Sequence, residues 1–146
     1  MDEVRIKLEE TQRYASLAKQ LRAEQIDAFL RESVAALRAS HPPAGPAFAI
    51  YRGCSKEDEQ IVEVCLPTAA GEDEWPGGEV AYTVARGAEC SYPQILAAYD
   101  AVAEYAAAVG RELAGAPRET YLTELEAAEP AMEVAFPLVP QEPRGG

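Results

Sequence analysis

Two stretches of this sequence repeat one another at a separation of 70 residues, from Tyr51 to Tyr121. In each stretch a turn that contains proline precedes a tyrosine, and an apolar segment with a central glutamate follows and ends in proline. The matching parts are Gly45-Pro46, Tyr51 and Val62–Pro67 in the first copy, and Gly115–Pro117, Tyr121 and Met132–Pro137 in the second. Such a repeat predicts two copies of one supersecondary unit, packed about a pseudo-two-fold axis.

Each copy is predicted to contain one helix. The first helix has apolar residues at the spacing of an amphipathic helix and is expected to end before His41. The second is expected to begin at Ser91, with Gln94 in the capping-box position, and to end at Gly115. The apolar stripes are Ile26, Phe29, Leu30, Val34 and Leu37 in the first helix, and Ile95, Tyr99, Val102, Ala106, Val109 and Leu113 in the second.

A strand is predicted before each helix and a hairpin after it, so that each copy has the order β-α-β-β. The strands are expected at 14–19, 47–52 and 60–66 in the first copy and at 80–86, 119–125 and 132–136 in the second, with an extra strand at 4–8. The predicted fold class is α+β, with antiparallel sheets, helices on one side and a concave ligand pocket between the repeats. A chain of 146 residues suits one domain. We expect it to cover 1–140, with repeats at about 4–67 and 80–138, a Gly- and acid-rich connection at 68–78 and a flexible tail at 141–146.

Alternation along the strands divides each hairpin between two faces, and the helix is expected to cover the more aliphatic one. The residues assigned to the helix-covered core are Phe48, Ile50, Val62, Val64 and Leu66, and in the second hairpin Leu122, Met132, Val134 and Phe136. The residues assigned to the opposite face are Tyr51, Glu63 and Cys65, and in the second hairpin Glu119, Tyr121, Thr123 and Glu133. Two repeats about a two-fold axis would then line a groove with tyrosines and glutamates.

Such a groove favours a flat, apolar cation, because aromatic rings attract a cation and a carboxylate removed from water is stabilised by positive charge. Glu119 is the strongest candidate, since the equivalent position of the first copy is Ala49 and the symmetry is broken there by an additional carboxylate. The alternative is that Glu119 is an exposed glutamate at the end of a strand that pairs with Arg118 or a neighbouring lysine. Glu63 and Glu133 would then pair with basic residues across an open sheet.

The charge balance and the cysteines restrict the partners and the compartment. With 25 acidic and 13 basic residues the net charge is -12, which disfavours nucleic acid and anionic lipid as direct partners. The three cysteines form no C-x-x-C pair, no segment approaches the roughly 18 apolar residues that span a bilayer, and the N-terminus does not resemble a signal peptide. We therefore expect a cytoplasmic protein that contacts no membrane.

The segment 80–138 contains a set of short motifs in a fixed order: Arg86-Gly87, Tyr92, Ala98-Tyr99, the segment 117–122 and the segment 133–137. Through these motifs it resembles the C-terminal half of GyrI-like small-molecule-binding domains, a family that includes the effector-binding domains of multidrug-responsive transcription regulators. The first half matches more loosely, through Gly45-Pro46, Tyr51 and the segment 63–67. One departure is the segment 87–92, which stands where the family often has Gly-Pro-Tyr.

The resemblance implies two β-α-β-β repeats around a pocket for drugs and dyes, with a glutamate at Glu119 that contacts cationic ligands. Tyr51 and Tyr121 would line the wall of this pocket, together with Tyr82, Tyr92 and Trp75. Because no helix-turn-helix or basic region is found, we expect a standalone binding protein for aromatic, often cationic, apolar ligands.

Two other functions stay open. Some GyrI-like proteins hydrolyse strained electrophilic natural products, and Glu119 and Tyr121 could then position water and assist the leaving group. A gyrase-inhibitor-like role would instead require a protein partner, which the net charge of -12 allows. We expect no metal and no cofactor, because the single histidine, His41, lies in a proline-rich turn and no phosphate-binding glycine loop is present.

Overall fold

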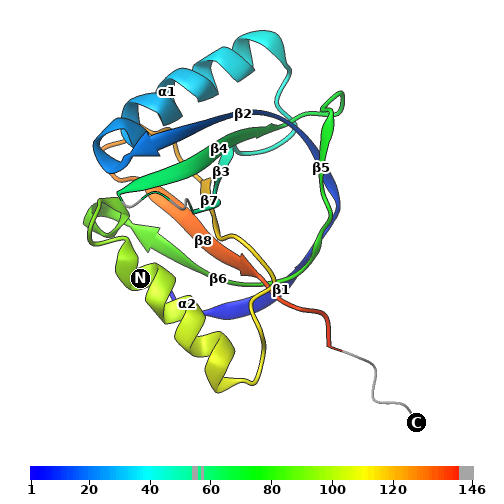
Figure 1. Ribbon diagram of the computed structural model, residues 1–146, viewed down its shortest axis with the longest axis vertical. Helices are drawn as coiled ribbons and strands as arrows, with labels where there is room; N and C mark the ends of the chain where they lie inside the picture. The colour runs from blue at the N-terminus through cyan, green and yellow to red at the C-terminus, as the bar shows by residue number, and fades with distance from the viewer. Residues whose placement is uncertain (54–55, 57, 142–146) are drawn as a thin grey trace.

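Eight antiparallel strands form one curled sheet in the computed structural model, which describes residues 1–53, 56 and 58–141 (Figure 1). Residues 142–146 of the predicted tail, Cys54 and Glu57 lie outside the described residues. The strands are β1 (Arg5–Glu9), β2 (Gln12–Arg22), β3 (Phe48–Tyr51), β4 (Glu59–Pro67), β5 (Asp73–Trp75), β6 (Gly78–Arg86), β7 (Arg118–Tyr121) and β8 (Ala131–Pro137). The helices are α1 (Ala23–Ser40), α2 (Leu96–Ala108) and the short 3-10 helix η1 (Gly87–Cys90).

The order of strands across the sheet follows the repeat. It is β1-β6-β8-β7-β3-β4-β2-β5, so that β7 and β3 are neighbours at the centre. One repeat is β2-α1-β3-β4 and the other is β6-α2-β7-β8, and the pseudo-two-fold axis passes between β3 and β7. The predicted α+β fold of two β-α-β-β repeats is confirmed, with the difference that the strands of both repeats join in one sheet.

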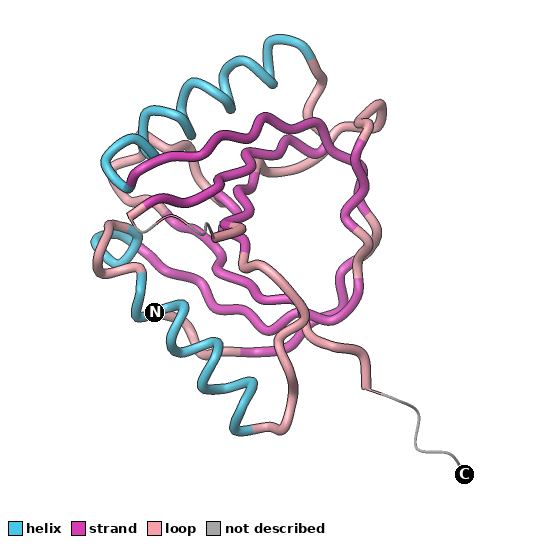
Figure 2. The backbone as a smooth tube through the Cα atoms, in the orientation of Figure 1, coloured by secondary structure: helices cyan, strands magenta, loops and turns pink. Residues whose placement is uncertain are grey.

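The two edge strands are exchanged between the repeats. β1 pairs with β6 of the second repeat, and β5 pairs with β2 of the first. The register is continuous from Glu9 opposite Gly78 to Gln12 opposite Trp75, so the segments 5–14 and 73–82 run along one another and close the curl (Figure 2). Gly77 lies between these pairs with φ +76°, and a Cβ there would come within 2.8 Å of the Glu9 carbonyl oxygen. The closure therefore requires glycine at this position.

Both helices cover the outer face of the curled sheet (Figure 1). α1 packs on β2 and β4, and α2 packs on β6 and β8. The α2 helix begins at Leu96 and not at Ser91, and it ends at Ala108 because Gly110 takes φ +74° and leaves the helical conformation before Gly115 is reached. Within the described chain, neither helix is long and apolar enough to cross a membrane.

The predicted division of the hairpins between two faces is partly wrong. Phe48 pairs with Cys65 and Ile50 pairs with Glu63, so Phe48 and Ile50 face the inside of the curl and not α1. Leu122, assigned to the core, is 47% exposed after the end of β7. Alternation alone could not identify the helix side, because the curl buries apolar residues on its inner face as well. This inner cluster consists of Tyr14, Phe48, Ile50, Cys65 and Trp75.

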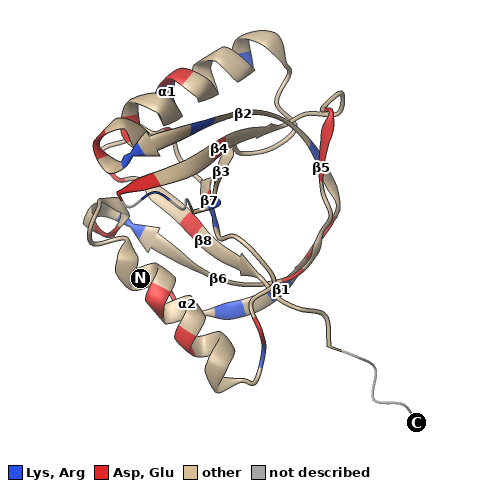
Figure 3. Cartoon of the chain, viewed as in Figure 1, with Lys and Arg blue, Asp and Glu red and all other residues tan. Residues whose placement is uncertain are grey.

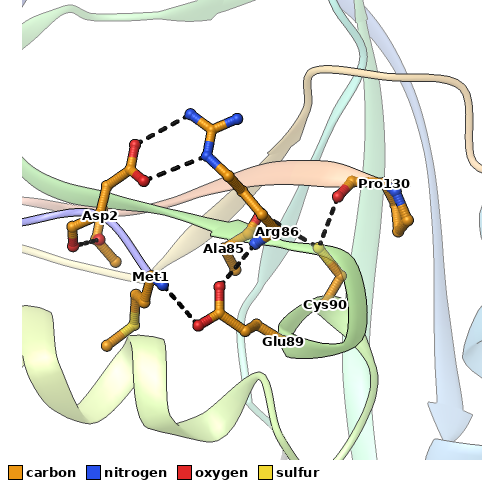
Figure 4. A network of polar contacts seen from close by, with 8 residues as sticks. Met1, Asp2, Ala85, Arg86, Glu89, Cys90 and Pro130 are labelled. Carbon is orange, nitrogen blue, oxygen red and sulfur yellow. Dashed lines mark hydrogen bonds and ion pairs between the residues drawn. The ribbon is translucent and has the colours of Figure 1, made fainter.

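The first residues of the chain are tied to β6 and η1 by a network of polar contacts (Figure 4). The ammonium of Met1 lies 2.6 Å from Glu89 Oε2, and the carboxylate of Asp2 accepts two hydrogen bonds from Arg86. The thiol of Cys90 donates to backbone carbonyls of the same corner. These contacts hold the chain before β1 against the sheet.

Acidic residues are distributed over both helices and over several strands, with basic residues between them (Figure 3). Many of the basic groups form ion pairs, such as Arg38 with Glu124 at 3.1 Å and Arg31 with Asp27 at 3.3 Å. Exposed pairs of this kind contribute about 0 to 1 kcal/mol each. In the part of the chain that the structure describes, the acidic residues are therefore not confined to one element.

Candidate ligand-binding site

The candidate site lies where the two repeats meet, at the seam of β3 and β7. Ala49 of β3 is paired directly with Glu119 of β7. The seam continues beyond the strands, because the amide of Tyr121 donates to the Ala47 carbonyl at 2.9 Å and the amide of Tyr51 donates to the Pro117 carbonyl at 3.1 Å. Since alternate residues of a strand share a face, these pairings place the glutamate and both tyrosines on one side of the sheet.

Three tyrosine hydroxyls surround the Glu119 carboxylate. Tyr51 donates to Oε1 at 3.0 Å and Tyr121 donates to the same oxygen at 3.2 Å. Tyr99, which projects from α2, donates to Oε2 at 2.5 Å. The hydroxyls of Tyr51 and Tyr121 are 3.4 Å apart. The site is therefore built from both repeats and one helix, around a single carboxylate.

This site is on the helix side of the sheet, contrary to the prediction. Tyr121 belongs to the apolar cluster that includes Leu30 and Val34 of α1, and Tyr51 packs against that cluster. Tyr99 packs against the cluster that α2 forms on β6 and β8. The predicted placement of Glu119, Tyr51 and Tyr121 on the face away from the helices is therefore wrong. As with Phe48, the cause is that the curled sheet buries apolar residues on both of its faces.

Glu119 is buried without a basic partner. Its residue is only 7% exposed, and among the described residues no lysine, arginine or histidine forms an ion pair with it. Glu63 and Glu133 differ in this respect, since Glu63 lies 2.6 Å from Arg52 and Glu133 lies 2.7 Å from Lys7. The pairing with basic residues considered from the sequence thus applies to those two glutamates and not to Glu119.

Burial raises the pKa of every ionisable group in the cluster. Removal from water raises the pKa of the Glu119 carboxyl above its ordinary value, and the hydrogen bonds from the three tyrosines oppose this rise. Burial and the neighbouring carboxylate also raise the pKa of each tyrosine, Tyr51, Tyr99 and Tyr121. The tyrosines consequently remain hydrogen-bond donors at neutral pH, and the carboxyl is the group of the cluster that can change its charge.

A small cavity lies beside Tyr121. Its volume is about 100 Å³, and it is enclosed by α1 and by the chain that follows β7. Arg31, Arg38, Glu124 and Glu126 contribute charged side chains to its wall, and Val34, Ala35, Ala47, Thr123 and Leu125 complete the lining with Tyr121. Pockets for organic ligands usually measure about 300 to 1,000 Å³. Glu119 does not line this cavity, so a large ligand at its carboxylate would require the side chains and elements around the tyrosine cluster to separate.

The remaining predicted site residues do not join Glu119. Glu63, Glu133, Tyr82 and Trp75 lie on strand positions that face the inside of the curl, as their pairings with Ile50, Val84, Arg5 and Gln12 show. Tyr92 is 71% exposed in the turn before α2. The single groove predicted from the sequence thus corresponds to two separate faces of one sheet.

Tyr99 is the site residue that sequence reasoning did not assign to the pocket. The sequence places Tyr99 on the apolar stripe of the second helix and among the residues that carry the resemblance, but a tyrosine on a buried stripe also needs a partner for its hydroxyl. That requirement, together with an unpaired glutamate on the strand that the helix covers, is the signal that could have indicated it.

A larger cavity lies on the inner face, near the start of the chain. Its volume is about 360 Å³ and its lining consists of Asp2, Glu3, Arg5, Tyr82 and Val84. The charged groups of this lining are already paired, Asp2 with Arg86 and Glu3 with Arg5. We favour the Glu119 cluster as the candidate site, because size alone does not select a ligand and only Glu119 combines a buried charge with the lack of a described counter-ion.

Comparison with known proteins gives matches only among solved structures. No protein-family model and no curated protein matches the sequence. The structure of the EcmrR C-terminal domain aligns with a TM-score of 0.78 and 17% identity, over 95% of this chain and 98% of that one. A hydrolase from Listeria innocua aligns with a TM-score of 0.70 and 8% identity, over 94% of this chain and 92% of that one.

A third structure was determined with a bound cation. SAV2435 bound to tetraphenylphosphonium aligns with a TM-score of 0.66 and 10% identity, over 94% of each chain. The TM-scores of these three alignments establish a shared fold, and identities this low show no more than that. The structural matches cover nearly the whole chain and bear out the resemblance of the sequence. This chain has the GyrI-like fold.

Proposed function

We propose that this protein binds apolar organic cations at Glu119, between the two repeats. The observation that carries the proposal is a buried carboxylate which, among the described residues, has three tyrosine hydroxyls as hydrogen-bond donors and no basic partner. An organic cation would supply the missing charge, and the surrounding tyrosine rings would contact its apolar groups.

The comparisons support the same ligand class. SAV2435, which shares the fold, was solved with tetraphenylphosphonium, a cation that carries four phenyl rings. The net charge of -12 adds long-range attraction for cations and opposes binding to nucleic acid. We further propose a cytoplasmic location, since the two cysteines of the described chain, Cys65 and Cys90, are unpaired.

Hydrolysis is the second candidate function, because a carboxylate with a raised pKa lies next to tyrosine hydroxyls. In this alternative Glu119 would accept a proton from water as the water oxygen attacks a strained ring, and Tyr121 would donate a proton to the leaving oxygen. One structure with this fold is that of a hydrolase, at 8% identity. We favour binding, because the tyrosine hydroxyls are neutral and leave the negative charge of the carboxylate available to a bound cation.

A calorimetric titration tests the proposal. Tetraphenylphosphonium should bind saturably, with at least about tenfold higher affinity than neutral triphenylphosphine oxide, because a charge contact in a buried site contributes more than 1.4 kcal/mol. Incubation with styrene oxide and mass spectrometry of the product tests the alternative, for which a mass gain of one water is expected. Equal affinity for both phosphorus compounds, or no binding of either, would reject the cation site.

A further inference from the structure

Arg118 lies next to Glu119 in the chain but on the other face of β7. Its guanidinium is centred 4.4 Å from the Trp75 ring and 5.1 Å from the Phe48 ring, on the inner face of the curl. It also forms an ion pair with Glu9. The residue is only 5% exposed. The two consecutive residues of the strand are thus held by separate clusters, one on each side of the sheet.

Two of the three partners of Arg118 come from the edges of the sheet, and the third, Phe48, belongs to the central strand β3. Glu9 belongs to β1 and Trp75 belongs to β5, the two strands that are exchanged between the repeats. Arg118 therefore connects the central strand to both edge strands across the inside of the curl. Within the described chain, no other arginine is in contact with two aromatic rings.

In the described part of the chain, several buried polar atoms around Arg118 lack a hydrogen-bond partner, which lowers the contribution of this cluster to folding stability. Arg118 Nε, Trp75 Nε1 and Glu9 Oε1 are all buried without a hydrogen-bond partner among the described residues. A buried ion pair with unsatisfied atoms contributes little to stability, and apolar replacements of such pairs are often neutral or stabilising. This favours a role for Arg118 other than stabilisation of the fold.

We propose that Arg118 is a positioning residue for Glu119 and that it couples the ligand site to the inner face of the sheet. β7 has four residues and is paired with β3 on one side and with β8 on the other. Because the backbone of such a central strand is held on both sides, a shift of the strand at Arg118 is passed directly to its neighbour Glu119. Arg118 is held by its contacts on one face and Glu119 by the tyrosines on the other, so a change at Glu119 displaces Arg118 relative to Trp75. This inference rests on the proposed function.

The test compares Arg118→Met and Arg118→Lys with Arg111→Met as a matched control. Arg111 is also a buried arginine with an ion pair to a glutamate and an unsatisfied Nε, but it follows α2 and does not contact β7 or Glu119 in any described contact. Arg118→Met should reduce tetraphenylphosphonium affinity by about 3- to 10-fold and leave triphenylphosphine oxide unchanged. Arg118→Lys should recover part of the loss, and Arg111→Met should bind both compounds as the wild type does.

The single tryptophan gives a second measurement. Saturation with tetraphenylphosphonium should change Trp75 emission, excited at 295 nm, with the same dissociation constant as calorimetry, and Arg118→Met should abolish this change. If Arg118→Met does not fold, Arg118→Lys and Glu9→Gln carry the test, with a smaller loss of cation affinity expected in each.

The outcomes separate this inference from the proposed function. If the wild type fails to prefer the cation, both are rejected. If the wild type prefers the cation and Glu119→Gln loses the preference, but Arg118→Met and Arg118→Lys keep it and the emission change, only the role of Arg118 is overturned. An equal loss of both compounds, in step with a lower melting temperature, would likewise reduce Arg118 to a structural residue.

Discussion

Glu119→Gln is expected to reduce the affinity for tetraphenylphosphonium by about 30- to 100-fold and to leave triphenylphosphine oxide nearly unaffected. Glutamine keeps the size of the side chain, and its carbonyl oxygen can accept the hydrogen bonds from Tyr51 and Tyr121. Its amide N–H would donate to the Tyr99 hydroxyl where Oε2 of Glu119 now accepts, so the substitution removes the charge and reverses one hydrogen bond. Isothermal titration calorimetry of both compounds measures the two affinities.

Two variants on the opposite face serve as controls. Glu63→Gln and Glu133→Gln also remove one negative charge each, from a half-buried and a buried carboxylate that already pair with Arg52 and Lys7. They should retain the preference for the cation. A comparable loss in all three variants would show that the general acidity of the protein attracts the ligand, and a loss confined to Glu63 or Glu133 would move the site to the inner face.

Cation affinity is also expected to decrease on acidification, at a higher pH than for an ordinary glutamate. Burial raises the pKa of Glu119, and a cation is stabilised by the ionised form only. Below that pKa, each unit of pH should lower the affinity by about tenfold. The raised pKa values of the neighbouring tyrosines keep them protonated over this range, so Glu119 alone should set the profile.

The pH dependence of folding stability has the opposite sign to that of cation affinity. Because the pKa of Glu119 is higher in the folded than in the unfolded state, folding takes up a proton between the two values. The contribution to stability is fully present below the unfolded pKa and is lost as the pH rises through the folded pKa.

In Glu119→Gln the affinity for the cation should be low and independent of pH. A wild-type affinity profile that is flat between pH 4 and 8 would contradict the account.

The sequence repeat was sufficient to predict the fold, because two copies of β-α-β-β restrict how strands and helices can pack. It could not predict the exchange of β1 and β5, which depends on pairing between segments about 70 residues apart. Nor could it predict the short strand β5, whose three residues lie in a Gly- and acid-rich connection. The end of α2 was misplaced because two glycines, Gly110 and Gly115, were both able to end it.

The sequence indicated Glu119 because the equivalent position of the first repeat is Ala49. The structure pairs these two residues directly across the seam, so the asymmetry lies at the site. The alternation of side chains along the strand could not decide whether Glu119 lies on the helix side of the sheet or on the other side. In an open sheet the aliphatic side packs on the helix, whereas this curled sheet also buries Phe48, Ile50 and Trp75 on its inside. The prediction therefore grouped Glu119 with Glu63 and Glu133, which the register places on the opposite side.

The location of the bound cation tests the central claim most directly. A crystal structure with tetraphenylarsonium, in which arsenic replaces phosphorus, would mark the ligand by its anomalous signal. We expect the arsenic on the helix side of the sheet, within roughly 5 to 6 Å of the Glu119 carboxylate and in contact with the tyrosine rings. Arsenic on the inner face, near Glu63, Glu133 or the cavity beside Tyr82, would contradict the assignment of the site.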